Sequence, residues 1–268
     1  MADADSAGIL ARDAELLKTT VREAGALALS LFRTDLKNWT KGASSPVSEA
    51  DIAVNDLLEQ RLRAATPDYG WLSEESADDE RRLGKSLVWI VDPIDGTRGY
   101  LAGREDWCVS VALIEDAAPV LAAVFAPASD EFFFAARGRG ATRNGMHVHA
   151  TRGTALDFAR VAGPKPLAER LNRSSGEISL HPRIASLALR LCRVAQGNLD
   201  AAFAGGNSRD WDLAAANLIV QEADGKMTTL SGDAILYNRR EVAHGMVVAA
   251  GRDRHASIVS HFRSRPLP

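Results

Sequence analysis

The chain has 268 residues, of which 46% are hydrophobic and 25% charged, and its formal net charge is −3. This length and composition are typical of a globular protein with one large or two ordinary domains and a well-buried core. The weak negative charge gives no electrostatic basis for binding nucleic acid or an anionic membrane surface. The N-terminus lacks the pattern of a signal peptide, no run approaches a membrane span, and Cys108 and Cys192 are too few for a disulfide framework. We therefore expect a cytoplasmic protein with two reduced, buried thiols.

Two amphipathic helices are predicted at the start of the chain. Apolar residues recur at helical spacing over residues 5–32 and again over residues 48–65. We interpret the first helix as structural. In the second, Ser48 or Asp51 lies where an N-terminal cap belongs, and spacing alone favours capping over catalysis.

A buried strand is predicted over residues 88–91, where the sequence is continuously apolar and rich in β-branched side chains. The sequence becomes acidic at the next residue, Asp92. Because Pro93 cannot donate a hydrogen bond to a β-ladder, we expect the strand to stop there. Asp92 is therefore predicted to lie at a strand end.

The turn that follows this strand is predicted to gather oxygen atoms. Asp95 and Gly96 form a turn pair that can bring the carboxylates of Asp92 and Asp95 and the carbonyl of Ile94 to one side of the chain. Clustered oxygen ligands suit a hard cation such as Mg²⁺. The N–H groups of this turn, beside the hydroxyl of Thr97, suit an anion. A plain strand-ending turn is the alternative, since Asp-Pro and Asp-Gly are common turn pairs.

Further acidic positions are predicted at the ends of other elements. Glu74 and Glu75 follow a short apolar run, residues 69–73, with the composition of a strand. Asp212 lies in the first turn of a strongly helical stretch at residues 210–223. Acidic groups at the ends of three separate elements indicate a site that the fold assembles.

The two halves of the chain differ in pattern. Three short apolar strands, residues 107–114, 120–127 and 131–136, predict an antiparallel meander. Beyond residue 148, strands alternate with helices, which indicates a mainly parallel sheet. The helices and strands expected in this half are a helix at 181–196, a helix at 210–223, a strand at 245–250 and a terminal helix. We predict two domains, residues 1–145 and 146–268, with the boundary in the glycine-rich turns of residues 137–147.

Four segments in series, residues 45–51, 73–76, 89–97 and 211–215, together resemble the signature of the inositol monophosphatase superfamily of metal-dependent, lithium-sensitive phosphatases. The resemblance runs over nearly the whole chain. It implies a layered αβαβα sandwich of the inositol monophosphatase and fructose-1,6-bisphosphatase type, with an α+β N-terminal half, an α/β C-terminal half and the site between them. It also implies a small phosphorylated substrate and a homodimer.

The resemblance implies two or three Mg²⁺ ions per active site. The implied metal ligands are Glu74, Asp92, the Ile94 carbonyl, Asp95 and Asp212. Asp92 would bridge two ions. Glu75 is interpreted as a neighbouring surface charge, because the family uses the first glutamate of the pair. The histidines lack zinc spacing, and structural or surface roles are expected for His181, His244 and His255.

The same resemblance implies the catalytic and phosphate-binding groups. Thr97 and Glu74 would position the attacking water, and Asp51 would hydrogen-bond Thr97 and help to orient it. The N–H groups of Gly96 and Thr97 would bind the phosphate, together with the N-terminus of the helix that begins at Asp212. These groups are the ones that phosphomonoester hydrolysis needs beside metal ions.

The substrate predicted first is a nucleoside bisphosphate. Residues 203–209 contain no carboxylate where inositol-specific members carry a glutamate that contacts ring hydroxyls. Segments 95–100 and 236–238 look more like the CysQ-type 3′(2′),5′-bisphosphate nucleotidases. Arg190 falls where those enzymes tend to have a lysine, and Arg98 and Arg190 could bind a second phosphate bidentately. Both arginines could equally be solvated charges.

Three alternatives stay open at this point. An inositol-1-monophosphatase is the first, and a histidinol-phosphate phosphatase, which shares the pattern of residues 95–98, is the second. The third is a catalytically silent, metal-binding regulatory protein on the same scaffold, because a fold does not guarantee activity. The completeness of the implied ligand set favours an enzyme.

Overall fold

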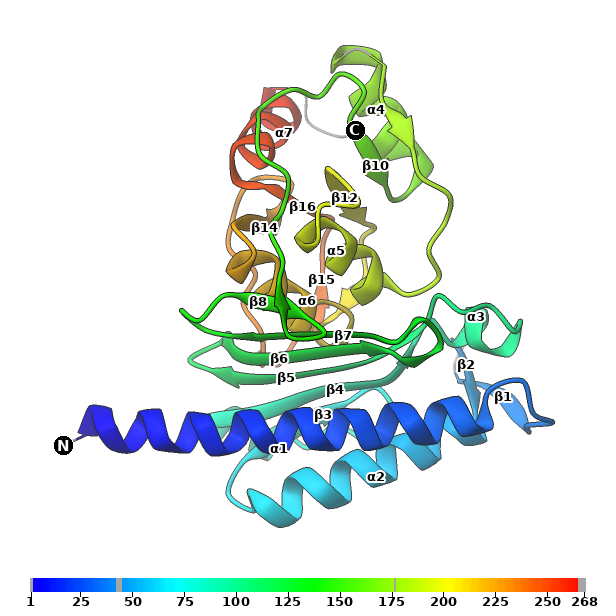
Figure 1. Cartoon of the computed structure of the whole chain (residues 1–268), viewed down its shortest axis with the longest axis vertical. Coiled ribbons are helices and arrows are strands. Elements are labelled where there is room, and N and C mark those ends of the chain that lie inside the picture. Colours follow the sequence, from blue (N-terminus) through cyan, green and yellow to red (C-terminus); the bar gives the residue numbers. More distant parts are fainter. Residues whose placement is uncertain (1, 42–44, 176, 265–268) are drawn as a thin grey trace.

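The computed structural model describes residues 2–41, 45–175 and 177–264. They form alternating layers of helices and sheets (Figure 1). Helices α1 and α2 cover the outer face of a seven-stranded sheet, α5 and α6 lie between this sheet and a five-stranded sheet, and α4 and α7 cover the far face. The predicted αβαβα sandwich is confirmed.

The helices are α1 (Ala2–Leu31), α2 (Glu49–Ala65), α3 (Thr97–Leu101), α4 (Lys165–Ser175), α5 (Leu187–Ala195), α6 (Asp210–Glu222) and α7 (Arg252–Ser264), with 3₁₀ turns η1 (Glu80–Gly84) and η2 (Pro127–Ser129). None of the helices in these described ranges has the length and apolar content needed to cross a membrane.

The seven-stranded sheet carries the predicted meander. Its strands, in spatial order, are β3 (Gly70–Ser73), β4 (Leu87–Asp95), β5 (Cys108–Glu115), β6 (Ala118–Ala126), β7 (Glu131–Ala136), β8 (Ala141–Arg143) and β9 (Met146–His147). Only β3 and β4 pair in parallel. The proposed domain boundary falls in the turn between β8 and β9, and the division into two domains stays a prediction.

Strand β4 is apolar on both faces because both faces are covered. Trp89 and Val91 pack in the cluster with α1 and α2, whereas Val88 and Ile90 pack in the cluster with α5 and α6. Successive side chains of a strand point to opposite faces, so a strand between two helical layers needs apolar residues at every position. The continuous apolar run in the sequence therefore marks a strand that is buried on both faces.

The predicted end of this strand is wrong. β4 continues through Pro93 to Asp95, and its register against β5 shifts on the way. Asp92 lies opposite Ser110 and Asp95 lies opposite Cys108, so β4 holds one residue more than β5 in this interval. Such a β-bulge tolerates a proline, because the extra residue leaves a position without a ladder hydrogen bond.

The second sheet is mixed. Its strands, in spatial order, are β11 (Ser179–Leu180), β10 (Arg160–Ala162), β12 (Ala201–Ala204), β16 (Val247–Gly251) and β14 (Gly225–Thr229). β10 pairs in parallel with β11 and β12, but β16 is antiparallel to both β12 and β14. Four strands, β11, β10, β12 and β14, therefore run in the same direction, as predicted, and β16 runs in the opposite direction. A parallel β16 would need a crossover connection such as a helix, but a loop leads into this strand.

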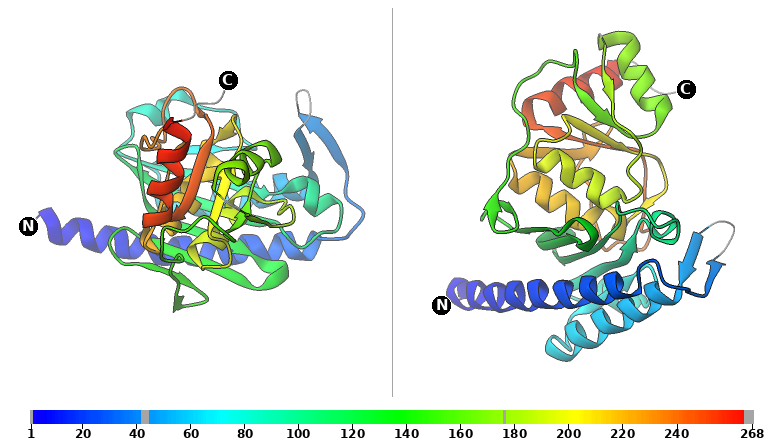
Figure 2. Two further views of the ribbon diagram at one scale, coloured as in Figure 1. Left: turned by 90° about the horizontal axis from the view of Figure 1, so that it is seen from above. Right: turned by 45° about the vertical axis from the view of Figure 1, so that its right-hand side comes forward.

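Two small ribbons flank these sheets. The first pairs β1 (Asn38–Lys41) with β2 (Ser45–Ser48), and the second pairs β13 (Ser208–Arg209) with β15 (Ala243–His244). Figure 2 shows the β1–β2 ribbon at the end of the α1–α2 helix pair, on the side of α3. Cys108 and Cys192 are buried and free, as expected.

The helix predicted over residues 181–196 begins later than expected. α5 starts at Leu187, and the hydroxyl of Ser186 accepts a hydrogen bond of 2.9 Å from the Leu189 N–H as its N-terminal cap. A serine cap satisfies one of the N–H groups that an α-helix leaves without a partner. The extended segment before Ser186 reaches the seven-stranded sheet, where it matters for the site.

His255 supports the prediction of a structural histidine and gives a testable pH dependence. Its side chain projects from α7 and is buried, with Nε2 2.9 Å from the Thr228 hydroxyl, and burial lowers its pKa from 6.5 to about 4. The unfolded chain binds a proton below pH 6.5, whereas the folded chain resists protonation until about pH 4. The stability contributed by neutral His255 is thus complete above pH 6.5 and is lost as the pH falls toward 4.

We expect the free energy of unfolding, measured in urea, to decrease less between pH 7 and pH 5 in His255→Gln than in the wild type. Glutamine keeps a polar side chain there but does not titrate. The control is His147→Gln at an exposed position. Identical pH profiles of wild type and His255→Gln would contradict the assignment.

Candidate active site

Three aspartates from two distant parts of the chain meet at the carboxyl end of β4. Asp92 and Asp95 lie on either side of the β-bulge, and Asp212 lies in the first turn of α6. One carboxylate oxygen of each lies within 4.8 Å of those of the other two. Asp92 and Asp95 are buried, with 1% and 6% of their surface exposed, and Asp212 is half-buried. The fold therefore assembles these three predicted site residues.

Asp92 is the least compensated of the three. Its Oδ1 is buried and, among the described residues, meets no hydrogen-bond donor. Burial raises its pKa well above 3.8, and the charges of Glu74, Asp95 and Asp212 raise it further. An unpaired buried charge is costly, and a group of carboxylates is stable only with a cation or with protons. The donors are all oxygens, which fit a hard divalent ion such as Mg²⁺.

Asp95 is held by the start of α5. Its Oδ2 accepts hydrogen bonds of 2.6 Å from the Ser186 hydroxyl and from the Ala188 N–H. Burial raises the pKa of Asp95, and the hydrogen bond from Ser186 opposes this rise. Ser186 was missed from the sequence because the helix was predicted to begin at residue 181. The signal available was a serine directly before an apolar run, which is typical of an N-terminal cap.

Asp212 and Glu74 complete the group of carboxylates at the carboxyl end of β4, which we call the acidic corner. The Arg209 N–H donates to Asp212 Oδ2 at 2.6 Å, which fixes Asp212 in the first turn of α6. Burial, followed by the charge of Asp95, raises the pKa of Asp212 to about 7. Glu74 follows β3, and burial, followed by the charges of Asp212 and Glu75, raises its pKa to about 8. Glu74 thus lies in the same electrostatic environment, although it is not one of the three within 4.8 Å.

The interpretation of Glu75 as a surface charge is wrong. Its side chain is only 3% exposed and forms an ion pair with Lys41 of β1. The Lys41 ammonium also donates to the Glu74 carbonyl at 3.3 Å. A carboxylate buried at this depth needs such a partner. Lys41, which sequence analysis did not single out, therefore ties the β1–β2 ribbon to the turn that carries Glu74.

Thr97 lies between two of the predicted groups. Its hydroxyl oxygen is 3.1 Å from Asp51 Oδ1 and 3.0 Å from the Ile94 carbonyl oxygen. Asp51 Oδ2 accepts hydrogen bonds from the Ser48 N–H and the Ser48 hydroxyl, at 2.8 and 2.6 Å. Asp51 therefore caps α2, as spacing suggested, and also contacts Thr97, as the resemblance implied. Both interpretations describe the same side chain.

Gly96 allows the bulge and α5 to approach each other. It adopts φ of 97°, which favours glycine, and a Cβ there would lie 3.0 Å from the Ser186 N. Gly96 is the N-terminal cap of α3, and Thr97 is the first residue of this helix. The turn for which phosphate binding is predicted therefore lies beside Asp95 and the start of α5.

The two candidate arginines differ. Arg98 lies on the exposed side of α3. Arg190 is largely buried on α5, and its guanidinium donates hydrogen bonds of 3.1 Å to the carbonyls of Phe203 and Ile184. Arg190 thereby supports the segment that ends at Ser186. The predicted structural role of His244 also fits the structure, since its Nε2 lies 2.6 Å from Asp210 Oδ1 at the start of α6.

Comparison with known proteins gives the family. The sequence profile described as the inositol monophosphatase family matches residues 10–267. The chain belongs to the inositol monophosphatase family. It is 31% identical to an inositol-1-monophosphatase of Caulobacter vibrioides over 243 residues, which cover 86% of this chain and 92% of the relative. It is 36% identical to a histidinol-phosphatase of Mycobacterium tuberculosis over 212 residues, which cover 74% of this chain and 79% of the relative.

The fold matches solved structures of the same family. One is a crystal structure of an inositol monophosphatase and NADP phosphatase complexed with Mg²⁺ and phosphate, with a TM-score of 0.83 and 22% identity over 96% of this chain and 97% of the other. Membership in this family of phosphatases confirms the prediction of an enzyme of that class. The relatives named here do not support the nucleotidase branch over the inositol monophosphatase alternative.

Replacement of Asp92 by Asn should stabilise the metal-free protein. The amide removes a buried charge without altering the packing of β4, and we expect the free energy of unfolding in EDTA to rise by about 1–3 kcal/mol. The added stability of the wild type in Mg²⁺, about 2.7 kcal/mol at a hundredfold excess over Kd, should be lost in the variant. Urea unfolding with and without Mg²⁺ measures both effects. Asp68→Asn, at an exposed position, is the control, and an unfolded Asp92→Asn would indicate a structural role.

Ser186→Ala should weaken Mg²⁺ binding, because the Asp95 carboxylate loses one of its hydrogen bonds. It removes one of the two hydrogen bonds on Asp95 Oδ2, and the loss of such a supporting group typically reduces metal affinity or activity by about 10- to 100-fold. The Mg²⁺ concentration for half-maximal stabilisation should rise accordingly, while the lost cap costs about 1 kcal/mol of stability. Ser186→Thr, which keeps the hydroxyl, should recover most of the affinity. Equal Mg²⁺ requirements in Ser186→Ala and the wild type would show that Asp95 needs no such support.

Proposed function

We propose that this protein is a Mg²⁺-dependent phosphomonoesterase that hydrolyses a small alcohol phosphate with one phosphate group, inositol 1-phosphate first. The observation that carries this proposal is the buried grouping of Asp92, Asp95 and Asp212 with an uncompensated oxygen on Asp92. The grouping lies beside the N-terminus of α6 and the N–H groups of Gly96 and Thr97, which suit a phosphate. The inositol-1-monophosphatase relative supports the choice of substrate.

A second candidate is histidinol phosphate. The relative of that name is 36% identical to this chain, and residues 203–209 contain no carboxylate to contact the ring hydroxyls of inositol. The bisphosphate nucleotide predicted from the sequence has less support, because it relied on Arg190. The guanidinium of Arg190 is hydrogen-bonded to two backbone carbonyls. A homodimer stays a prediction.

The residues that would hold Mg²⁺ are Glu74, Asp92, the Ile94 carbonyl, Asp95 and Asp212. When bound, the metal supplies an activated water and neutralises charge on the phosphoryl oxygens. Thr97, fixed beside Asp51, would orient the water through its hydroxyl, and Glu74 would accept a hydrogen bond from the same water. The Gly96 and Thr97 N–H groups and the N-terminus of α6 would bind the phosphate of the substrate.

Phosphate release from inositol 1-phosphate, histidinol phosphate and 3′-phosphoadenosine 5′-phosphate tests the proposal. We expect turnover of the first or second substrate in Mg²⁺, none in EDTA, and inhibition by Li⁺. Asp92→Asn should lower kcat by at least about three orders of magnitude, because it removes a charge from the centre of the site, whereas Asp68→Asn should match the wild type. Preference for the nucleotide would restore the first substrate prediction. Folded, Mg²⁺-binding protein without turnover of any of the three would favour the silent regulatory alternative.

A further inference from the structure

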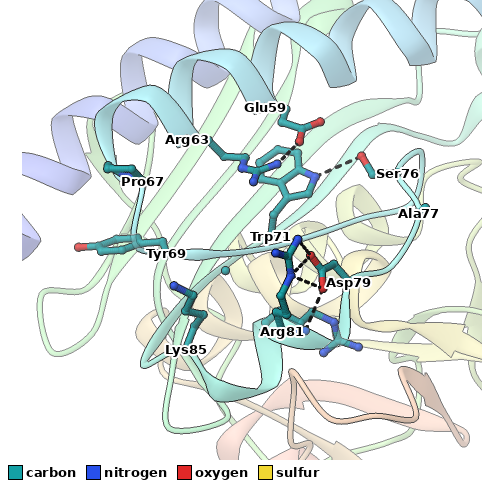
Figure 3. Close-up of a pocket in the computed structure, with 12 residues that line it drawn as sticks. Glu59, Arg63, Pro67, Tyr69, Trp71, Ser76, Ala77, Asp79, Arg81 and Lys85 are labelled. Carbon is teal, nitrogen blue, oxygen red and sulfur yellow. Dashed lines mark hydrogen bonds and ion pairs between the residues drawn. The ribbon is translucent and has the colours of Figure 1, made fainter.

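A cavity lies at the free edge of β3, away from the carboxylate site. It has a volume of about 410 Å³, lies between the last turns of α2, the edge of β3 and η1, and is lined by none of the predicted metal ligands (Figure 3). We call it the β3 edge pocket. Its volume falls in the range of roughly 300–1,000 Å³ that is typical of small-molecule sites.

Cationic side chains dominate this pocket. Four of them line it, namely Arg63, Arg81, Arg82 and Lys85, against the lining carboxylates of Glu59 and Asp79, and buried Arg82 is paired with Asp78. Each of the three arginines has a carboxylate partner, so the positive charge in excess is that of Lys85. Across the described ranges, no carboxylate pairs with the ammonium group of Lys85. An anion is therefore the ligand that the charge distribution favours.

The exposed arginines of the pocket are available to a ligand. Arg63 pairs with Glu59 and Arg81 pairs with Asp79, and the arginine side chains are 55% and 87% exposed. Exposed ion pairs of this kind contribute only about 0–1 kcal/mol, so the guanidiniums can turn toward a phosphate at little cost. A guanidinium binds a phosphate bidentately. The pocket thus presents two such groups beside an ammonium.

An aromatic ring forms the floor between these cations. In Figure 3, the Trp71 indole lies between Arg63 on one side and Arg81 on the other. Only 8% of the surface of Trp71 is exposed, and its Nε1 donates to the Ser76 hydroxyl at 3.2 Å. A flat apolar surface flanked by cations suits an anion that also carries a ring or another apolar group.

Hydrogen bonds connect this floor to the turn that carries Glu74. The Ser76 hydroxyl accepts hydrogen bonds of 3.2 Å from both Trp71 Nε1 and Asn55 Nδ2. The Ser73 hydroxyl donates to Asn55 Oδ1 at 2.7 Å. These hydrogen bonds connect Trp71, Ser73 and Ser76 to Asn55 of α2. A ligand that displaces Trp71 acts on both ends of the turn around Glu74.

A second connection leads to α6. Arg82, buried in the wall of the pocket, donates to Asn238 Oδ1 at 2.8 Å, and the Asn238 N–H donates to Asp210 Oδ2 at 2.8 Å. Asp210 is the first residue of α6, the helix that carries Asp212. The pocket wall is thus connected to both sides of the carboxylate site.

We propose that the β3 edge pocket binds a small organic anion with a phosphate-like group, and that its occupancy changes turnover at the carboxylate site. Arg63, Arg81 and Lys85 bind the anionic group, and Trp71 contacts the apolar part. The effect on turnover passes through the hydrogen bonds of Ser76 to the turn around Glu74. This site is separate from the one that binds the phosphate to be hydrolysed.

Phenylphosphonate is a suitable probe, because it has a phosphate-like group, a flat ring and a carbon–phosphorus bond that a phosphomonoesterase does not cleave. Calorimetric titration in Mg²⁺ should show saturable binding to Asp92→Asn, in which the carboxylate site is disabled. In that background, Arg81→Ala/Lys85→Ala should weaken binding at least tenfold. The matched control, Arg61→Ala/Lys165→Ala, removes two positive charges outside the pocket and should bind as Asp92→Asn does.

Turnover gives a second readout with the wild-type site. Competition at the carboxylate site raises only the apparent KM, whereas occupancy of the pocket should change kcat. This change in kcat should be absent in Arg81→Ala/Lys85→Ala, whose turnover without the probe should equal that of the wild type. Loss of all binding in Asp92→Asn would overturn the pocket as a site, as would equal affinities of the two double variants. An unchanged kcat at saturating probe would overturn the effect on turnover.

Discussion

The repulsion among buried carboxylates at the end of β4 is the constraint on which the rest of this structure depends. Asp92, Asp95 and Asp212 converge within 4.8 Å, with Glu74 close enough to raise the pKa of Asp92. Burial and like charge oppose this arrangement, so it needs fixed donors around it. The donors come from the first turns of two helices: Ser186 and Ala188 of α5, and Arg209 at α6. The layered fold brings the starts of both helices to the carboxyl end of β4.

This requirement explains how the two halves of the chain are joined. β4 supplies two of the carboxylates and packs on α5 and α6, so the side chains of Val88 and Ile90 share one apolar cluster with those of Leu189 and Leu213. The cluster that fixes the helices also fixes the groups that surround the site. Packing in that cluster and the chemistry of the corner therefore cannot be separated, because a shift of either helix displaces a donor.

Most of the fold and the acidic corner could be predicted from the sequence, for physical reasons. The apolar run of β4, the helical spacing of α1 and α2 and the alternation of the second half follow from burial, which leaves a local pattern. Predictions from local sequence patterns were wrong where a contact with a distant part of the chain determines the structure. Pro93 is tolerated inside β4 because β5 shifts register opposite it, and α5 starts late because Ser186 is needed both as a cap and as a donor to Asp95.

The roles of charged side chains were the least predictable. Glu75 reads as a surface charge in sequence, but Lys41, far away in the chain, makes its burial possible. The sequence suggests that Arg190 is solvated or binds phosphate, whereas its partners in the structure are the carbonyls of Phe203 and Ile184. Charge alone does not specify a partner, because the N–H groups of arginine donate to backbone carbonyl oxygens as well as to phosphate oxygens. The partner is known only when the chain is folded.

The contact between Asp95 and Ser186 joins residues 91 positions apart. During synthesis from the ribosome, residues up to the end of β4 emerge long before α5 does, so the acidic corner must exist for a time without its helix donors. Loop closure over such a distance is entropically costly and slow compared with the pairing of adjacent strands. The nascent N-terminal sheet therefore carries carboxylates that lack these donors until α5 and α6 dock on its face.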